Sequence, residues 1–274
     1  TQKKYFGPNV TWLLQAWQIN ESQRFVIQGL DKEHILVEVL DKNMGNNGGL
    51  GSDVRDGDGN IAPFIWTEVA NFGGNTGMRG FDTRVRKLNN INTSQVSVFS
   101  GYGFLSEGFE TNPLMYDMML EQMAKTPNDA STYLDTDAKM ASYLEAYRLR
   151  RYGYTDSDLR SAYESMLATV WHQKATSPQE GCVENILCAL PSTSLRGASV
   201  SSWGPKTGTE YDPALLFPGA DRFLAVVATK PDLLDLPTFR HDFIDLFLQL
   251  LGDRARQINE DCATSQKARD QFRK

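Results

Sequence analysis

The sequence predicts an α/β region followed by an all-helical region, and two observations carry this prediction. Residues 1–112 contain four short and nearly continuous apolar runs, whereas from residue 113 onward the apolar residues recur at helical spacing. We therefore expect residues 1–112 to form half of a (β/α)8 barrel and residues 113–274 to form a helical domain, which is incomplete.

The four apolar runs have the length and composition of β-strands. They are rich in β-branched and aromatic residues but do not alternate with polar ones, which is typical of parallel strands buried on both faces. A crossover helix between the first two is expected within residues 21–32. The runs are NVTWLLQAW (9–17), HILVEVLD (34–41), PFIWTEVA (63–70) and QVSVFSGYGF (95–104). Half a barrel would leave open sheet edges that must be covered.

The second region contains four segments with helical periodicity. In the last of them, Phe239, Phe243, Phe247 and Leu250 form one apolar stripe. The loop-rich segment 177–208 is expected to be irregular. The helical segments are residues 113–125, 136–154, 156–173 and 236–262.

Composition narrows the classes of partner. The chain has 274 residues, a net charge of -6 and a pI near 5.2, without the clusters of Lys and Arg that nucleic acids or anionic membranes require. No apolar run reaches the roughly 18–20 residues that span a bilayer, so we expect no membrane span. Because the chain begins at Thr1 and lacks a signal-peptide pattern, we expect a processed chain or part of a longer one.

Cysteines and sequons bear on the cellular compartment. Cys182 and Cys188 are close enough in sequence for a local disulfide, and free buried thiols are the alternative. Three Asn-x-Ser/Thr tripeptides favour a secretory or lysosomal route and are candidate N-glycosylation sites: Asn9, Asn20 and Asn92.

Most familiar catalytic patterns are absent from the sequence. Three histidines occur, none in a His-Glu-x-x-His pattern, and no Gly-x-Ser-x-Gly elbow is present. The segment DVRDGDGN (53–60) has the Asp and Gly density of a calcium loop but lacks its spaced ligands, so we favour a plain turn. We accordingly expect no metal and no cofactor.

The candidate site lies where the predicted strands end. Glu107 ends an apolar run in SGYGFLSEGFETN, and is either a solvated turn residue or a catalytic carboxylate. The loop NFGGN (71–75) offers glycines that let a ligand approach the backbone and the amides of Asn71 and Asn75. In a (β/α)8 barrel these loops would share the active rim, joined by Trp17. For Trp12 we favour core packing, whereas for Trp17 and Trp66 core packing and sugar binding stay open.

Several of these segments together resemble the α-N-acetylglucosaminidases of glycoside hydrolase family 89. The resemblance rests on WLLQAW, FIW followed by NFGGN, GYGFLSEG, NPLMY and RRYG, in this order. It implies a small α/β domain, a (β/α)8 barrel and a helical domain that together remove terminal α-linked N-acetylglucosamine with retention of configuration. The animal enzyme of the family is lysosomal and acts on heparan sulfate.

The resemblance also assigns roles. Glu107 falls on the family's nucleophile, while Trp17, Trp66, Asn71 and Asn75 would bind the sugar. The family's acid/base Glu lies on an earlier barrel strand, and no segment here matches that region. The chain therefore resembles the second half of the barrel and part of the helical domain, and activity would require the amino-terminal half, as a second chain or as a missing segment.

Departures from the family pattern leave two questions open. Thr67, Ser106 and Glu38 stand where the family usually has Cys, Pro and Asp, which puts the identity of the glycan in doubt. A non-catalytic carbohydrate-binding or interaction protein that keeps the scaffold is the alternative function. A homo-oligomer also stays open.

Overall fold

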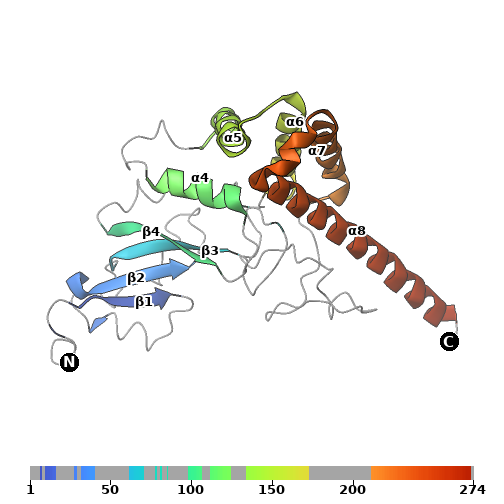
Figure 1. The fold of residues 1–274 in the computed structure, drawn as a ribbon. Coiled ribbons are helices and arrows are strands. Elements are labelled where there is room, and N and C mark those ends of the chain that lie inside the picture. Colours follow the sequence, from blue (N-terminus) through green and yellow to red (C-terminus); the bar gives the residue numbers. More distant parts are fainter. Residues whose placement is uncertain are drawn as a thin grey trace. The chain divides into compact units, whose positions relative to one another are not determined.

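The computed structural model describes about half of the chain, drawn as solid ribbon in Figure 1. The described residues are 7, 10–16, 28–29, 32–40, 62–70, 78, 81, 85, 98–106, 112–124, 134–172 and 211–272. They group into two compact units, which we call the sheet unit and the helical unit. The sheet unit comprises Thr1–Ala70, Lys87–Leu105 and Met119–Tyr133; the helical unit comprises Asn71–Arg86, Ser106–Met118 and Leu134–Lys274.

The sheet unit contains a four-stranded sheet in the order β1-β2-β3-β4. The strands are β1 (Trp12–Ala16), β2 (Ile35–Leu40), β3 (Phe64–Ala70) and β4 (Phe99–Ser106), and a short 3-10 helix η1 (Lys32–His34) leads into β2. β1 pairs with β2, and β2 with β3, in parallel. Gly101 lies nearest Ile65 and Gly103 nearest Thr67, so β4 runs in the same direction as β3. All four predicted strands are confirmed.

Burial of the sheet matches the expectation for β3 and differs for β1. Trp66, Thr67, Glu68 and Val69 follow one another in β3 and are all at most 2% exposed, so that strand is buried on both faces. Trp12 was expected in the core and is 38% exposed instead. The reason is its position, because β1 lies at the end of the described sheet and has a neighbour on one side only.

A backbone irregularity in β4 depends on glycine. Gly101 has φ +149°, a value that residues with a Cβ rarely adopt. The rings of Phe99 and Tyr102, three residues apart, nevertheless contact each other at a centroid distance of 4.8 Å. Strict alternation would place them on opposite faces, so the strand's alternation is interrupted at Gly101.

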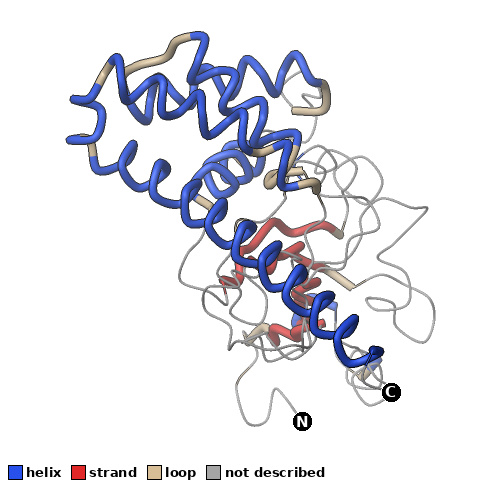
Figure 2. The backbone as a smooth tube through the Cα atoms, turned by 90° about the vertical axis from the view of Figure 1, so that its right-hand side faces the viewer, coloured by secondary structure: helices blue, strands red, loops and turns tan. Residues whose placement is uncertain are grey.

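The described part of the helical unit contains four helices and the start of α4. Figure 2 draws all described helices in blue. Asn112 opens α4 by accepting the Leu114 N–H at 3.1 Å, Thr136 caps α5, and Gly153 at φ +65° closes it. The helices are α4 (Pro113–Met123), α5 (Asp137–Tyr152), α6 (Ser157–Ala168), α7 (Phe217–Thr229) and α8 (Pro237–Phe272), with 3-10 turns η6 (Pro213–Leu215) and η7 (Pro231–Asp235).

One helix of this unit, α7, was not predicted. Its first turn contains Pro218 and Gly219, which interrupt the apolar period at the point where the helix begins. Gly219 is required by packing: a Cβ there would lie 2.7 Å from the Cβ of Ser165 on α6. The four helices predicted from periodicity, α4, α5, α6 and α8, are confirmed.

Other expectations are met only partly by the described residues. Of the expected crossover helix, Gln28 is helical and residues 21–27 lie outside the described part of the chain. The boundary between residues 112 and 113 stays a prediction. Among the described residues, no helix combines the length and the apolar content needed to cross a bilayer.

Candidate active site

The carboxyl ends of the parallel strands define where the candidate site residues attach. β1 ends at Ala16, β3 at Ala70 and β4 at Ser106, and in a parallel sheet these ends point to one edge. The residues that come next in the sequence are three of those predicted for the site: Trp17, Asn71 and Glu107. These three and Asn75 lie outside the described residues, so their roles stay predictions.

Trp66 is the one predicted site residue that the structure describes. It is 2% exposed, and its ring meets that of Tyr102 edge-on at 6.4 Å. Alternation along β3 puts it on the same face as Phe64, whose ring contacts Phe99 at 5.4 Å. The Trp66 side chain is therefore packed within the aromatic core of the sheet unit.

The opposite face of the sheet carries a row of polar side chains. Gln15 Nε2 donates to Glu38 Oε2 at 3.5 Å, and Thr67 Oγ1 donates to Glu38 Oε1 at 3.1 Å. Gly103 on β4 lies next to Thr67, because a Cβ at this glycine would be only 2.7 Å from Thr67 Oγ1. The glycine thus leaves room for the Thr67 side chain. The sequence marked Glu38 and Thr67 as departures, but did not predict that they would bond to each other.

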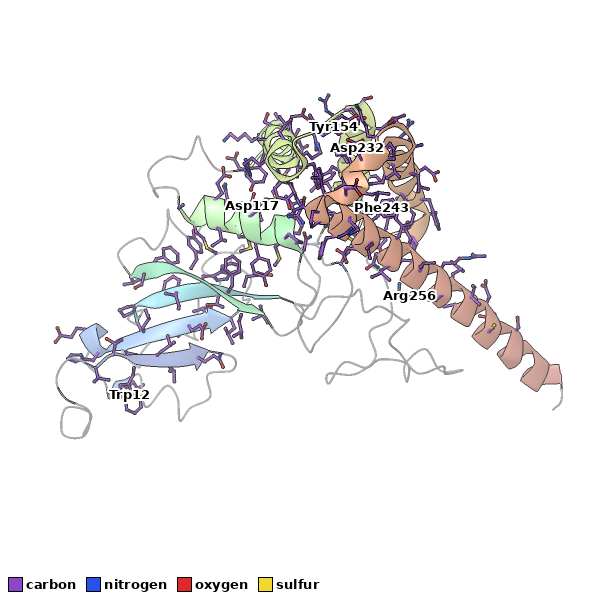
Figure 3. All side chains as sticks on the ribbon, viewed as in Figure 1. Trp12, Asp117, Tyr154, Asp232, Phe243 and Arg256 are labelled. Carbon is purple, nitrogen blue, oxygen red and sulfur yellow. The ribbon has the colours of Figure 1, made fainter. Side chains whose placement is uncertain are left out.

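The segment after Glu107 is tied to α5 within the helical unit. Tyr143 Oη donates to Asp117 Oδ2 at 2.5 Å, and Arg150 Nη2 donates to the same oxygen at 2.9 Å. Arg150 also lies 5.4 Å from the centre of the Tyr143 ring. Figure 3 labels Asp117 on α4, at the side facing α5. The NPLMY and RRYG motifs, far apart in sequence, are thereby joined through Asp117, one residue beyond the first.

The segment after the Asn-Phe-Gly-Gly-Asn loop is tied to the same unit at two points. The Met78 N–H donates to Gln249 Oε1 on α8 at 2.8 Å. The Phe81 N–H donates to the Trp171 carbonyl at 2.9 Å, and the two rings lie 6.0 Å apart. Sequence reasoning missed Gln249, because a Gln in a helical period gives no signal of its distant partner.

The RRYG motif is held from α8 by the half-buried Asp242. Arg151 donates to Asp242 through Nε at 2.5 Å and Nη2 at 2.7 Å, and Tyr152 Oη donates to the same carboxylate. Burial works against the charge of Arg151, but the bond and charge of Asp242 outweigh it and raise the pKa of Arg151. Burial also raises the pKa values of Tyr152 and Tyr163, so both phenols stay neutral donors.

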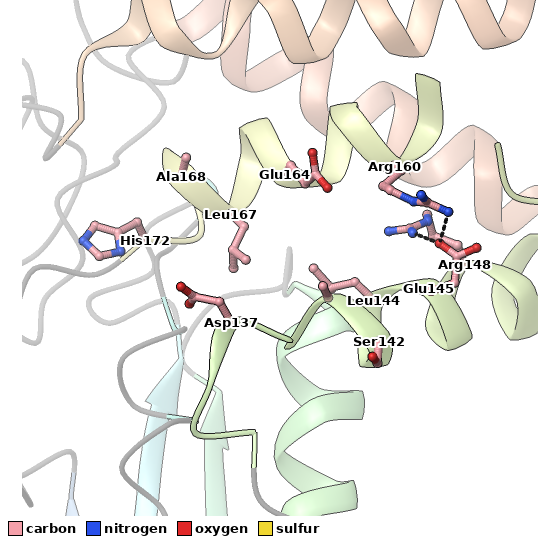
Figure 4. Close-up of a pocket in the computed structure, with 11 residues that line it drawn as sticks. Asp137, Ser142, Leu144, Glu145, Arg148, Arg160, Glu164, Leu167, Ala168 and His172 are labelled. Carbon is pink, nitrogen blue, oxygen red and sulfur yellow. Dashed lines mark hydrogen bonds and ion pairs between the residues drawn. The ribbon is translucent and has the colours of Figure 1, made fainter. Parts of the chain in front are cut away.

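A groove of about 1040 Å³ lies between α5 and α6 (Figure 4). At one end, Arg148 and Arg160 converge on Glu145, Arg160 at 3.4 Å. Burial acts to raise the pKa of Glu145, but its bonds to the two arginines prevail and lower it. Arg148 is itself 1% exposed and lies over the Tyr163 ring at 5.1 Å, so its role in the groove wall is structural.

The structure does not describe the remaining predicted sites. Cys182, Cys188, Asn9, Asn20 and Asn92 lie outside the described residues, as does the calcium-like segment 53–60. Within the part of the chain that is described, no three His, Cys, Asp or Glu residues are grouped so that they could hold a metal ion.

Two family models match the chain, one in each region. The model of the α-N-acetylglucosaminidase (NAGLU) tim-barrel domain matches residues 3–126, and the model of the C-terminal domain of the same enzyme matches residues 143–273. The α-N-acetylglucosaminidase of Homo sapiens is 24% identical over 213 residues, which are 74% of this chain and 24% of the human protein.

The chain is also similar to solved structures of family 89 glycoside hydrolases. The family 89 glycoside hydrolase from Clostridium perfringens in complex with PUGNAc has 25% identity and a TM-score of 0.71, covering 91% of this chain and 26% of that one. A Clostridium perfringens structure in complex with its substrate GlcNAc-α-1,4-galactose has 24% identity and a TM-score of 0.71, covering 92% and 26%, and supports the fold alone. The chain spans about a quarter of the length of these relatives.

Proposed function

Because the chain belongs to the α-N-acetylglucosaminidase family, glycoside hydrolase family 89, we propose that it supplies the nucleophile of a retaining exo-glycosidase. The substrate would be a glycan that ends in α-linked N-acetylglucosamine. One observation carries this proposal: Trp17, Asn71 and Glu107 each follow, in sequence, the last residue of a strand in a parallel sheet. In barrel enzymes that edge of the sheet holds the active site.

The reaction assigned to Glu107 is a double displacement. Its carboxylate attacks the anomeric carbon as the bond to the leaving oxygen breaks, and a second carboxylic acid protonates that oxygen. The same second group then removes a proton from water, which attacks the anomeric carbon and releases Glu107. Asn71 and Asn75 would hydrogen-bond the sugar, and Trp17 would offer it an apolar face.

The second carboxyl group has to come from outside the matched segments. Retention requires it about 5–5.5 Å from the nucleophile, and acid assistance contributes a factor on the order of 10²–10⁴. We propose that it belongs to the amino-terminal half of the barrel, as a second chain or a further segment. Heparan sulfate as substrate and a lysosomal or secreted location are parts of the same proposal, which the resemblance to the family and the three sequons suggest.

The test compares two neighbouring glutamates in the native preparation that contains this chain. Hydrolysis of p-nitrophenyl α-N-acetylglucosaminide should fall at least about a thousandfold in Glu107→Gln, because the nucleophile is lost. Glu110→Gln, three residues further along the same segment, is the matched control and should stay within about threefold of the wild type. Native mass measured on the same sample should exceed 30.7 kDa, because the missing half is present.

A chemical rescue identifies the role more directly than loss of rate. In Glu107→Ala, added azide should attack the anomeric carbon from the side that the carboxylate vacated and yield the β-glycosyl azide. A species of 30.7 kDa that binds 2-acetamido-1,2-dideoxynojirimycin but does not hydrolyse the p-nitrophenyl substrate would favour the alternative, a carbohydrate-binding protein on a glycosidase scaffold. Hydrolysis that survives Glu107→Gln would refute the assignment of the nucleophile.

A further inference from the structure

Helix α8 buries a polar stripe on a face that would ordinarily be apolar. Gln249, Asp253 and Arg256 follow at helical spacing and are 3%, 2% and 4% exposed. Residues of these types are rarely buried unless they make specific bonds. The stripe therefore calls for an explanation other than packing.

Both ends of the Gln249 amide make hydrogen bonds. Nε2 donates to Tyr211 Oη at 3.1 Å and to Asp253 Oδ1 at 3.1 Å. Oε1 accepts the backbone N–H of Met78 at 2.8 Å. With both ends of the amide engaged, its orientation is fixed and its carbonyl is aimed at one backbone position.

The surrounding residues fix that orientation further. Tyr211 Oη donates to Asp253 Oδ2 at 2.6 Å, and Arg256 Nη1 donates to Asp253 Oδ1 at 3.0 Å. A buried network of this kind adds little stability over an apolar core of the same volume. What it does provide is a fixed geometry, because Asp253 accepts from Tyr211, Gln249 and Arg256 at once and so holds these side chains together.

Met78 lies close in sequence to the predicted sugar-binding loop. It comes three residues after Asn75, and three residues span at most about 11 Å, so fixing Met78 limits the positions open to Asn75. The Phe81 N–H bond to the Trp171 carbonyl, at 2.9 Å, fixes the chain again three residues later. The chain is thus bonded to the helical unit three and six residues after Asn75.

We propose that Gln249 is a positioning residue for the sugar-binding loop at residues 71–75, acting through the backbone of Met78. This inference rests on the proposed function, because the loop's role in binding is part of it. Gln249 itself need not touch the sugar.

The experiment uses the assembled enzyme and the change Gln249→Met, which keeps the length of the side chain and removes its polar end. Because the loop would bind ground state and transition state alike, KM for the p-nitrophenyl substrate should rise about tenfold while kcat changes less than about threefold. Binding of 2-acetamido-1,2-dideoxynojirimycin should weaken by the same factor. Peptides containing Met78 should exchange their amide hydrogens faster in the variant.

Two controls separate positioning from general loss of stability. Gln257→Met makes the same change on an exposed position of α8 and should leave KM unchanged. Phe223→Leu lies in the core of the helical unit, 0% exposed, and should lower Tm without raising KM. Tyr211→Phe removes one bond that orients the Gln249 amide and should raise KM about threefold, a test that stands if Gln249→Met does not fold.

The outcomes distinguish this inference from the function on which it rests. An unchanged KM in Gln249→Met or, if that variant does not fold, in Tyr211→Phe overturns the positioning role while Glu107-dependent hydrolysis keeps the function. An equal rise of KM in Phe223→Leu would show that the effect is loss of stability, and would also overturn it. Hydrolysis that does not depend on Glu107 would overturn both.

Discussion

Asp242, a half-buried acid, bonds to several side chains of the helical unit at once. It accepts two bonds from Arg151, one from Tyr152, and lies 3.2 Å from His241 Nδ1. The RRYG motif was visible in the sequence, but its partner lies 91 residues further along the chain. Sequence patterns of this kind mark residues that matter without revealing what they bond to, because pairing at such separations is decided by the fold.

The cost of removing Asp242 follows from what it leaves behind. Asp242→Leu strips the carboxylate from Arg151, whose side chain is 17% exposed, and should lower the free energy of unfolding by roughly 2–3 kcal/mol in urea titration. The matched change Asp232→Leu affects an exposed residue of η7 and should cost less than about 0.5 kcal/mol. Equal losses for the two variants would mean that the Arg151 pair contributes nothing.

At the scale of elements, apolar periodicity predicted most of the described strands and helices. It predicted all four strands and four of the helices, because long runs with one period leave a clear signal. It missed α7, since the Pro218-Gly219 pair resembles a turn. It also placed Trp12 in the core, because an apolar run does not reveal which strand lies at the end of a sheet.

Gly219 allows the close approach of α6 and α7 to be tested against helix propensity. In an ordinary helix Gly→Ala stabilises by about 1 kcal/mol, but here the new Cβ would meet Ser165 at 2.7 Å and the Ala162 carbonyl at 3.3 Å. Gly219→Ala should therefore destabilise, by about 1–3 kcal/mol in thermal or urea unfolding.

The reciprocal change provides the control. Ser165→Gly removes the atom that the new methyl group would strike, so the double variant should regain stability relative to Gly219→Ala alone. Coupling of this sign is expected only for residues in contact. A stabilising Gly219→Ala would show that the helices separate at little cost.

At the scale of the whole molecule, the two units are assembled from segments that are not continuous in sequence. The segments that follow β3 and β4 group with the helices, so both predicted site loops begin in the sequence where the sheet unit ends. The sequence pattern predicts one domain boundary, between residues 112 and 113, but it does not reveal that segments of the two units alternate along the chain. It could equally not foresee that Met78 would bond to a residue 171 positions away.

The three sequons allow the cellular compartment of the protein to be tested. Asn9, Asn20 and Asn92 all fall within the segments of the sheet unit, and none within those of the helical unit. If the chain follows a secretory or lysosomal route, glycans should be confined to these sites, because N-glycosylation takes place on that route. Treatment of the native protein with an N-glycosidase should then lower its mass and convert each occupied Asn to Asp.

Loss of a single hydroxyl tests each site without changing the asparagine. Thr11→Ala removes the first sequon at an exposed position and should abolish the glycan on Asn9 alone. Mass spectra recorded before and after reduction would show whether Cys182 and Cys188 form a disulfide. An oxidising compartment permits this disulfide and a reducing one does not. Unmodified asparagines together with free thiols would argue against the secretory route and, with it, against a lysosomal substrate such as heparan sulfate.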